Sequence, residues 1–476
     1  MKKFSSFILA MLFLSTLIIY PADSGFGKDF AGAKNVILLI GDGFGPSHFR
    51  AAQLYSQKIL KQELNMVNAM NNGHTAYLIN DTADSTVTES AAAAGQIATG
   101  QKMYARSLSI AEDGKTPVKT ILEMAKEKGL SVGLVTTSGI TDATPGGFSA
   151  HVPSRYDEEK IAEQQLALGI DVLMGGRKQF FLPKTAKDID EKNKEKDNDK
   201  KDDGKRKDGR NLMLEARNNG YTVVETSKGL NLAPANSKIL GLFNMANMSS
   251  EIDRAATLEP SLAEMTEKAL QVLSKNKNGF FAMIEGGRID HASHRNDTAA
   301  MIHEVLAFDK AIGAALNFAK NNPDTLIIVT SDHETGGFAM IGNGKTNKEY
   351  IGMDFEAVSK VTASFESILK KIKKNPTPEN VKAIVKKYMS IELTDEEANI
   401  VATDSIKKMD PYNYTYEYLH SLAFVLRTYF RAGWTGATHT AEPIYLYGTG
   451  PGSEMLKGLI HNTDLFTIMK TALNLK

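Results

Sequence analysis

The sequence predicts an α/β fold with a mostly parallel central sheet, flanked by helices on both faces and carrying a helical insert. Short apolar runs rich in β-branched residues recur along the chain, at residues 36–40, 131–136, 221–224, 280–284, 326–330 and 444–447. Amphipathic stretches separate several of these runs, at residues 120–128, 262–274 and 299–319. Alternation of this kind is typical of parallel sheets that are covered by helices.

The first 24 residues predict a secretory signal peptide. Lys2 and Lys3 form a basic start, residues 7–20 are almost all apolar, and residues 22–24 are small, as at a cleavage site. The apolar run of about 14 residues is shorter than the roughly 20 that a membrane-spanning helix needs, and an uncleaved anchor is the alternative. We therefore expect a secreted or periplasmic protein with no membrane attachment in its mature form.

Residues 25–476 are expected to form a single domain, in which two segments interrupt the alternation. Residues 184–210 are crowded with Lys, Asp, Glu and Asn, so we expect a solvated, disordered loop there. Residues 343–431 are expected to form a helical cap beside the functional site. Its helices are predicted at residues 355–371, 379–389 and 414–430.

Composition narrows the classes of function. The hydrophobic content of 42% and charged content of 24% are ordinary for a globular protein. The formal net charge is zero, so no overall field favours nucleic acid or a membrane surface as a partner. The chain contains no cysteine, which excludes disulfides, thiolate zinc sites and cysteine nucleophiles.

Metal-binding side chains follow two of the predicted strands directly. Asp42 comes after the run at 36–40, and Asp332 and His333 come after the run at 326–330. Ligands of open α/β sheets bind outside the carboxyl ends of the strands, so we expect these side chains to meet at one edge. Asp42 alone has an ordinary alternative, because aspartate after a strand is often a turn or helix-capping residue.

A second set of candidate ligands follows the run at 280–284. Glu285 ends that strand, and Asp290 and His294 are four residues apart, so one turn of helix would bring them together. Carboxylate and imidazole ligands suit zinc, whereas oxygen-rich sites suit magnesium.

Ser90 is the candidate nucleophile. It opens the alanine-rich stretch Ser90-Ala91-Ala92-Ala93-Ala94, a predicted helix whose first N–H groups attract an anion. The composition of this stretch fits equally well an ordinary helix of small residues, in which Ser90 lies near the N-terminal cap and has no catalytic role.

Two further blocks contain polar residues among small ones. Asp142, Thr144 and Arg155 lie in one block, and the planar guanidinium of arginine matches two phosphoryl oxygens. His439 lies in the other, and taken singly it is ambiguous.

Together these blocks resemble the alkaline phosphatase family, in order and in type, over essentially the whole mature chain. The resemblance implies a single catalytic domain that hydrolyses phosphate monoesters at alkaline pH through a phosphoserine at Ser90. It implies two zinc ions and one magnesium ion. The first zinc would be held by Asp290, His294 and His439; the second by Asp42, Asp332, His333 and the Ser90 oxygen; and the magnesium by Asp42, Thr144 and Glu285, with Asp142 acting through water. Arg155 would clamp the phosphate, and His291 would modulate both the phosphate and the magnesium pocket.

The chain departs from the family pattern at one position. Glu89 stands where the family usually has the aspartate that orients the arginine, which leaves phosphate affinity and turnover open. The family resemblance also leaves a homodimer open, and the natural substrate is not determined by the sequence.

Three other functions compete with this reading. A related phosphodiesterase or nucleotide pyrophosphatase would keep the zinc ligands but typically lacks the arginine clamp and the magnesium ligands. A sulfatase of the same superfamily needs a formylglycine precursor, commonly cysteine, which this chain lacks. A catalytically silent, metal-stabilised binding protein is the third alternative.

Overall fold

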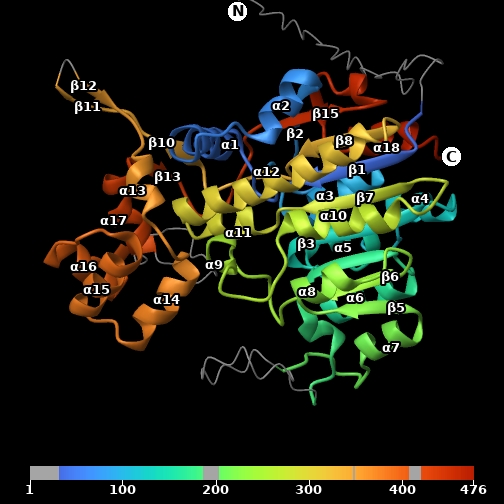
Figure 1. The fold of residues 1–476 in the computed structure, drawn as a ribbon, viewed down its shortest axis with the longest axis horizontal. Coiled ribbons are helices and arrows are strands. Elements are labelled where there is room, and N and C mark those ends of the chain that lie inside the picture. Colours follow the sequence, from blue (N-terminus) through green and yellow to red (C-terminus); the bar gives the residue numbers. More distant parts are fainter. Residues whose placement is uncertain (1–31, 186–202, 347–348, 407–419) are drawn as a thin grey trace, which may run out of the picture. The chain divides into compact units, whose positions relative to one another are not determined.

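The computed structural model describes residues 32–185, 203–346, 349–406 and 420–476. A sheet of ten strands forms its centre, in the order β16-β2-β15-β8-β1-β7-β3-β4-β6-β5 (Figure 1). The ten strands are β1 (Asn35–Ile40), β2 (His74–Ile79), β3 (Ser131–Gly139), β4 (Val172–Gly176), β5 (Tyr221–Val224), β6 (Lys238–Leu242), β7 (Phe280–Glu285), β8 (Thr325–Thr330), β15 (Ile444–Thr449) and β16 (Gly458–His461). Within this sheet only β15 pairs in the antiparallel sense, with β2 and β8, which confirms the mostly parallel sheet.

The middle of the sheet is buried on both faces. Every residue of β1, β7 and β8 is buried, in agreement with their almost unbroken apolar sequences. β1 pairs in parallel with both neighbours, and Ile40 lies opposite Glu285 on β7 and Thr330 on β8. The three carboxyl ends therefore meet at one edge of the sheet.

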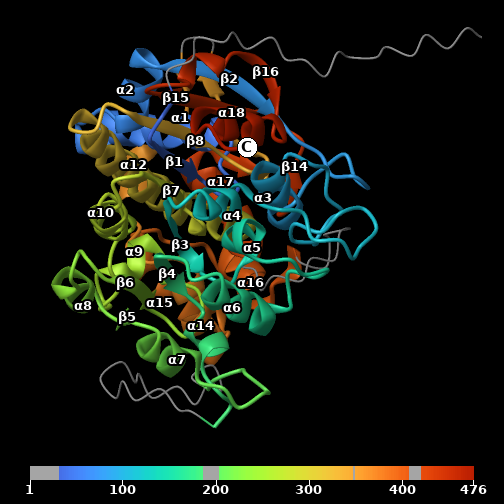
Figure 2. The same ribbon diagram turned by 90° about the vertical axis from the view of Figure 1, so that its right-hand side faces the viewer.

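Helices cover both faces of this sheet (Figure 2). On one side lie α1 (Pro46–Tyr55), α2 (Asn65–Asn72), α10 (Leu262–Leu273) and α12 (Thr298–Lys320). On the other side lie α3 (Ser90–Thr99), α4 (Ile121–Glu127), α5 (Ala143–Ser149), α6 (Glu158–Ala167) and α18 (Asp464–Ala472). The sequence predicted α4, α10 and α12 to within about two residues, since each combines an apolar stripe with a capping side chain at its start.

Shorter elements connect these layers. They are α7 (Leu212–Asn218), α8 (Ser227–Leu232), α9 (Glu251–Arg254), α11 (Arg288–His294), β9 (Glu334–Thr335), β10 (Phe338–Met340), β13 (Ala432–Trp434) and β14 (His439–Thr440). Two of these strands, β9 and β14, pair with each other and so join residues about a hundred positions apart.

The segment predicted as a helical cap is not helical throughout. It begins with an antiparallel hairpin of β11 (Asn343–Thr346) and β12 (Glu349–Ile351). Its helices are α13 (Phe355–Ser359), α14 (Phe365–Lys374), α15 (Pro378–Met389), α16 (Asp395–Thr403) and α17 (His420–Phe430). The single helix predicted at 355–371 is wrong, because Ser364 caps α14 and its N–H and hydroxyl both donate to Asp253. The part of the last predicted helix before residue 420 lies outside the described residues.

Two other predictions fall wholly or mainly outside the described residues. The signal peptide at 1–24 does so entirely, as does most of the predicted loop 184–210. At the end of that loop Arg206 is buried, and its guanidinium donates to the carbonyl oxygen of Glu159 at 2.9 Å.

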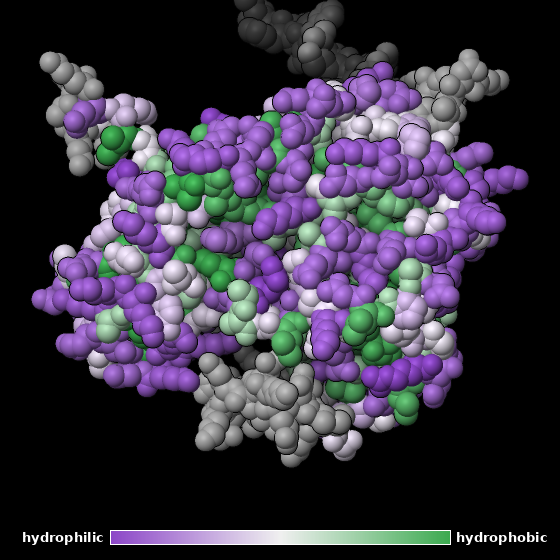
Figure 3. All heavy atoms as spheres, in the orientation of Figure 1, coloured by the Kyte–Doolittle hydropathy of each residue, from purple (hydrophilic) through white to green (hydrophobic). Residues whose placement is uncertain are grey.

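Polar side chains cover most of the face seen in Figure 3, with small apolar areas between them. Among the helices in the described ranges, none combines the length and the hydropathy that crossing a bilayer would need.

Candidate active site

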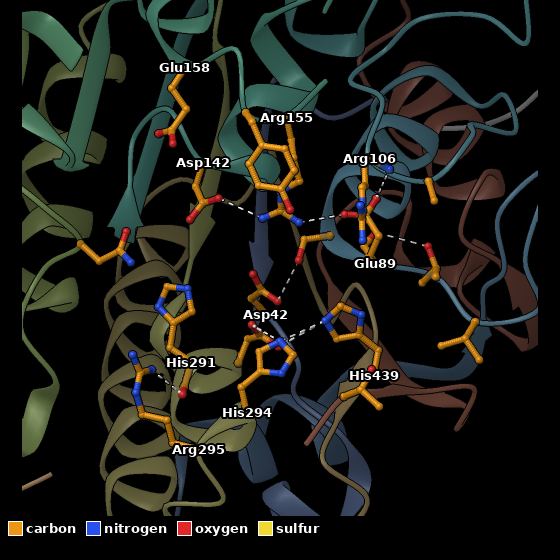
Figure 4. A pocket seen from close by; sticks show the side chains of 18 of the residues that line it. Asp42, Glu89, Arg106, Asp142, Arg155, Glu158, His291, His294, Arg295 and His439 are labelled. Carbon is orange, nitrogen blue, oxygen red and sulfur yellow. Dashed lines mark hydrogen bonds and ion pairs between the residues drawn. The ribbon is translucent and has the colours of Figure 1, made fainter. Parts of the chain in front are cut away.

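A cavity of about 610 Å³ opens at the edge where β1, β7 and β8 end. Its walls come from distant parts of the chain, including Asp42, Ser90, Arg155, His294 and His439 (Figure 4). The convergence of these side chains follows from the parallel pairing of the central strands.

One candidate metal-binding group consists of Asp290, His294 and His439, whose ligand atoms all lie within 4.8 Å of one another. The Nε2 atom of His294 is 3.2 Å from Oδ2 of Asp290 and 3.2 Å from Nε2 of His439. Although burial opposes ionisation of Asp290, the three surrounding histidines hold its pKa well below the usual range. A charged carboxylate beside two imidazoles is a donor set that suits zinc.

Contacts outside this group orient its ligands. His294 Nδ1 lies 2.6 Å from the carbonyl oxygen of Ala437, which can only accept, so Nδ1 carries a proton and Nε2 is the atom that faces Asp290 and His439. His439 is positioned by the β14–β9 pairing, which sets it opposite Thr335. The Thr335 hydroxyl donates to Oδ1 of Asp290 at 2.5 Å.

The second group consists of Asp42, Asp332 and His333, all buried. The backbone N–H groups of Gly43 and His333 donate to Oδ1 of Asp332, at 3.0 and 2.9 Å. Oδ2 of Asp332 is buried and has no hydrogen-bond partner among the described residues. Burial raises the pKa of Asp42, and the nearby carboxylates of Asp332 and Asp290 raise it further. A cation between these carboxylates would relieve that repulsion.

The two groups are neighbours. The rings of His333 and His439 have centroids 3.9 Å apart. Ser90 lies beside them, with its Oγ 3.2 Å from Nε2 of His333 and 3.5 Å from Oδ1 of Asp42.

Ser90 does not cap the helix that it opens. The cap of α3 is Glu89, whose carboxylate accepts from the N–H groups of Ala91 and Ala92. Capping therefore does not account for Ser90, whose buried hydroxyl instead contacts His333 and Asp42.

Glu285 and Thr144 form a third set of oxygen donors. Both carboxylate oxygens of Glu285 and the hydroxyl of Thr144 are buried without a hydrogen-bond partner in the described parts of the chain. Burial raises the pKa of Glu285 to about 8; the neighbouring hydroxyls of Thr136 and Thr144 oppose this rise, and the carboxylate of Asp142 adds to it. Orphaned buried oxygens are costly, so these residues fit a hard cation such as magnesium.

Arg155 lies between two carboxylates. Its Nη1 is 2.8 Å from Oε2 of Glu89, and its Nη2 is 3.0 Å from Oδ1 of Asp142. Glu89 therefore orients the arginine directly, in spite of the longer side chain. Asp142 belongs to neither metal-binding group, and its Oδ2 lies 2.7 Å from Nη2 of Arg177.

His291 lines the cavity without joining either group. Its Nδ1 is 3.0 Å from Nη1 of Arg288, and since arginine only donates, Nδ1 accepts and the proton lies on Nε2. Arg288 is held in turn by Glu366 on α14, with 2.6 Å between Nη2 and Oε2.

Several charged residues of the cavity were not predicted from the sequence, namely Arg106, Glu158, Arg177 and Arg295. Arg177 directly follows β4, so the rule that identified Asp42 would also have identified it. The run Val172–Gly176 was not recognised as a strand, because it has one β-branched residue and ends in two glycines. Arg106 lies in an irregular loop, and the sequence gives no signal for it.

Comparison with known proteins agrees with this geometry. The alkaline phosphatase family model matches residues 33–475. Alkaline phosphatase 4 of Bacillus subtilis is 34% identical over 456 residues, which is 93% of this chain and 90% of that protein. Alkaline phosphatase 3 of the same organism is 33% identical over 492 residues, which is 98% of this chain and 96% of that protein. The crystal structure of Thermus thermophilus alkaline phosphatase has a TM-score of 0.82 and 32% identity, covering 94% of this chain and 92% of that one. This chain therefore belongs to the alkaline phosphatase family and is an enzyme of that family.

Proposed function

We propose that the protein hydrolyses phosphate monoesters through a phosphoserine at Ser90. The observation that carries this proposal is the position of the Ser90 hydroxyl, 3.2 Å from His333 and beside two adjacent metal-binding groups. Serine is a weak nucleophile near neutral pH, and a hydroxyl at such a site can be activated by a bound cation.

The donor atoms fit two zinc ions and one magnesium ion. Zinc would be held by Asp290, His294 and His439 and, separately, by Asp42, Asp332, His333 and the Ser90 oxygen, while magnesium would be held by Asp42, Thr144 and Glu285 with Asp142 acting through water. When bound, these ions would supply Lewis acidity that ionises the Ser90 hydroxyl and neutralises the negative charge of the phosphate and the leaving oxygen.

The residues of the chain then bind and orient the reacting groups. Ser90 Oγ attacks the phosphorus in line, the bond to the leaving alkoxide breaks, and water later hydrolyses the phosphoserine. Arg155 holds two phosphoryl oxygens with its planar guanidinium, and Glu89 and Asp142 fix the plane of that group. His291 lines the same cavity and can donate a hydrogen bond there from the N–H of its Nε2. Neutral histidine ligands and ionised oxygen nucleophiles favour an alkaline pH optimum.

Arg155 favours this reaction over the phosphodiesterase alternative. A guanidinium held by two carboxylates can bind two of the three non-ester oxygens of a monoester, and the dianionic monoester offers it more negative charge than a diester, which is a monoanion. The complete set of buried donors around Ser90 likewise favours an enzyme over a metal-stabilised binding protein.

We also propose that the protein is exported, on the basis of the basic and apolar start of the sequence at residues 1–24. Mass analysis of the N-terminus of the protein purified from outside the cytoplasm tests cleavage near residue 24. A homodimer is proposed from the family alone, and sedimentation analysis of the holoenzyme tests it.

The activity is tested by comparing hydrolysis of 4-nitrophenyl phosphate and bis-4-nitrophenyl phosphate at alkaline pH, with zinc and magnesium added. We expect a strong preference for the monoester that Ser90→Ala and chelation both abolish. Preference for the diester would assign the protein to the phosphodiesterase branch and contradict the role given to Arg155. Retained metal with no turnover of either compound would favour the binding protein.

A further inference from the structure

Arg106 lines the cavity from the irregular loop between α3 and α4, next to Glu89 (Figure 4). Its side chain is exposed, and its backbone has a φ of 69°, in the left-handed region that residues with a Cβ avoid. Strained backbone of this kind gathers at functional sites, where the surroundings hold it in place.

The main chain of Arg106 is bound to both residues of the phosphate clamp. Its N–H donates to Oε1 of Glu89 at 2.8 Å, and its carbonyl oxygen accepts from the N–H of Arg155 at 2.9 Å. These two bonds fix the position of the Cα beside the clamp. Neither bond uses the side chain, so the guanidinium is free to serve another purpose.

The carboxylate of Glu89, which contacts the main chain of Arg106, already accepts its full number of hydrogen bonds. Oε1 of Glu89 accepts from the N–H groups of Ala92 and Arg106, and Oε2 accepts from the N–H of Ala91 and from Arg155. A carboxylate has about four acceptor positions, so Glu89 has none left for a further guanidinium.

Other arginines of the cavity have carboxylate partners. Arg155 pairs with Glu89 and Asp142, and Arg177 pairs with Asp142 and Glu158. In the described parts of the chain, no carboxylate oxygen is paired with the guanidinium of Arg106. Its positive charge therefore faces the mouth of the cavity without a counter-ion from the protein.

We propose that Arg106 forms a second anion subsite at the mouth of the cavity, which binds a negatively charged group of the substrate other than the phosphate that is transferred to Ser90. This inference rests on the proposed phosphomonoesterase activity. It predicts a preference for phosphomonoesters that carry a second anionic group, either a carboxylate or another phosphate. Arginine suits both groups, because its planar fork can donate two hydrogen bonds to either one.

The experiment compares KM within two pairs of substrates. The first pair is glycerol 3-phosphate and 3-phosphoglycerate, which differ by a hydroxymethyl and a carboxylate; the second is fructose 6-phosphate and fructose 1,6-bisphosphate. The wild type, Arg106→Gln and Arg106→Lys are assayed with zinc and magnesium present. Lys115→Gln is the matched control, because it removes a charge from the same loop at an exposed position outside the cavity.

We expect the wild type to have the lower KM for the doubly anionic member of at least one pair. An exposed ion pair contributes little, so Arg106→Gln should change the ratio of the two KM values by about two- to fivefold. Arg106→Lys should restore much of the preference, Lys115→Gln should leave the ratio as in the wild type, and added salt should weaken the preference. If the KM ratio responds in the first pair alone, the group that Arg106 binds is a carboxylate. If it responds in the second pair alone, that group is a phosphate.

An equal change of KM for both members of each pair in Arg106→Gln would overturn the inference, because it would mean that the residue only shapes the loop. A wild type without preference for the anionic members would overturn it as well. Both results leave the proposed function standing, since that depends on hydrolysis of glycerol 3-phosphate being lost in Ser90→Ala.

Discussion

The substitution Glu89→Gln tests how the phosphate clamp is held. The glutamine keeps Oε1, which can still accept from the N–H groups of Ala92 and Arg106. It replaces Oε2 by an amide NH₂, which faces two other donors, the N–H of Ala91 at 3.1 Å and Nη1 of Arg155 at 2.8 Å. Two of four hydrogen bonds are therefore lost.

The magnitude follows from those two bonds. A hydrogen bond to a charged partner contributes about 1.5–3 kcal/mol, and the loss of a helix cap costs about 1 kcal/mol. We expect the free energy of unfolding to fall by about 2–4 kcal/mol. The guanidinium of Arg155 would lose its bond to Glu89 and keep its bond to Asp142, and a loss of about 1.5 kcal/mol in its positioning would raise KM about tenfold.

The assay measures urea unfolding and the KM for 4-nitrophenyl phosphate in the same preparations, at a fixed concentration of free metal. Glu158→Gln is the control, because it removes a carboxylate of the same cavity that binds Arg177 and leaves the contacts of Arg155 intact. If Glu89→Gln matched the wild type in both measurements, the four-bond role of this carboxylate would be refuted.

Three further predictions concern stability and metal binding. Burial raises the pKa of Glu304 to about 7, so the folded state holds its proton more tightly than the unfolded chain; this stabilisation is complete below about pH 4.5 and is lost as pH rises through about 7. Urea unfolding should show Glu304→Gln gaining about 3 kcal/mol relative to the wild type across that range, and a constant difference would contradict the shift. Chelation should lower the thermal midpoint, because Asp42 and Asp332 would be left to repel each other, and zinc should restore it. Gly43→Ala should lower metal content and activity, because its Cβ would lie 2.9 Å from Oδ1 of Asp290; Gly114→Ala, with similar φ and no atom within 4 Å, should show backbone strain alone.

The sequence was sufficient for the parts of the fold and the candidate site that depend on local pattern. Asp42 and Asp332 were found because a long apolar strand ends abruptly at each, and Asp290 and His294 because a helical turn separates them. The structure brings each of these residues to the cavity edge, although their roles as ligands stay predictions.

Features set by contacts between distant residues could not be read from the sequence. The break between α13 and α14 depends on Asp253, which lies 111 positions from Ser364. The strands β2, β4, β6 and β16 were missed because they are short or contain glycine and exposed positions, so their apolar pattern is weak. His439 was assigned by family resemblance alone, since a two-residue strand leaves no periodicity.

The pairing of β14 with β9 also determines when the first metal-binding group can exist during folding. Asp290 and His294 lie on one short helix, but the third donor of the group comes from His439, almost 150 positions later. A chain that is still being synthesised and has not yet reached β14 therefore has only two of the three protein donors of this group. High-affinity binding of the proposed zinc ion at this group would therefore require the nearly complete chain, and its uptake would report that the C-terminal part has docked.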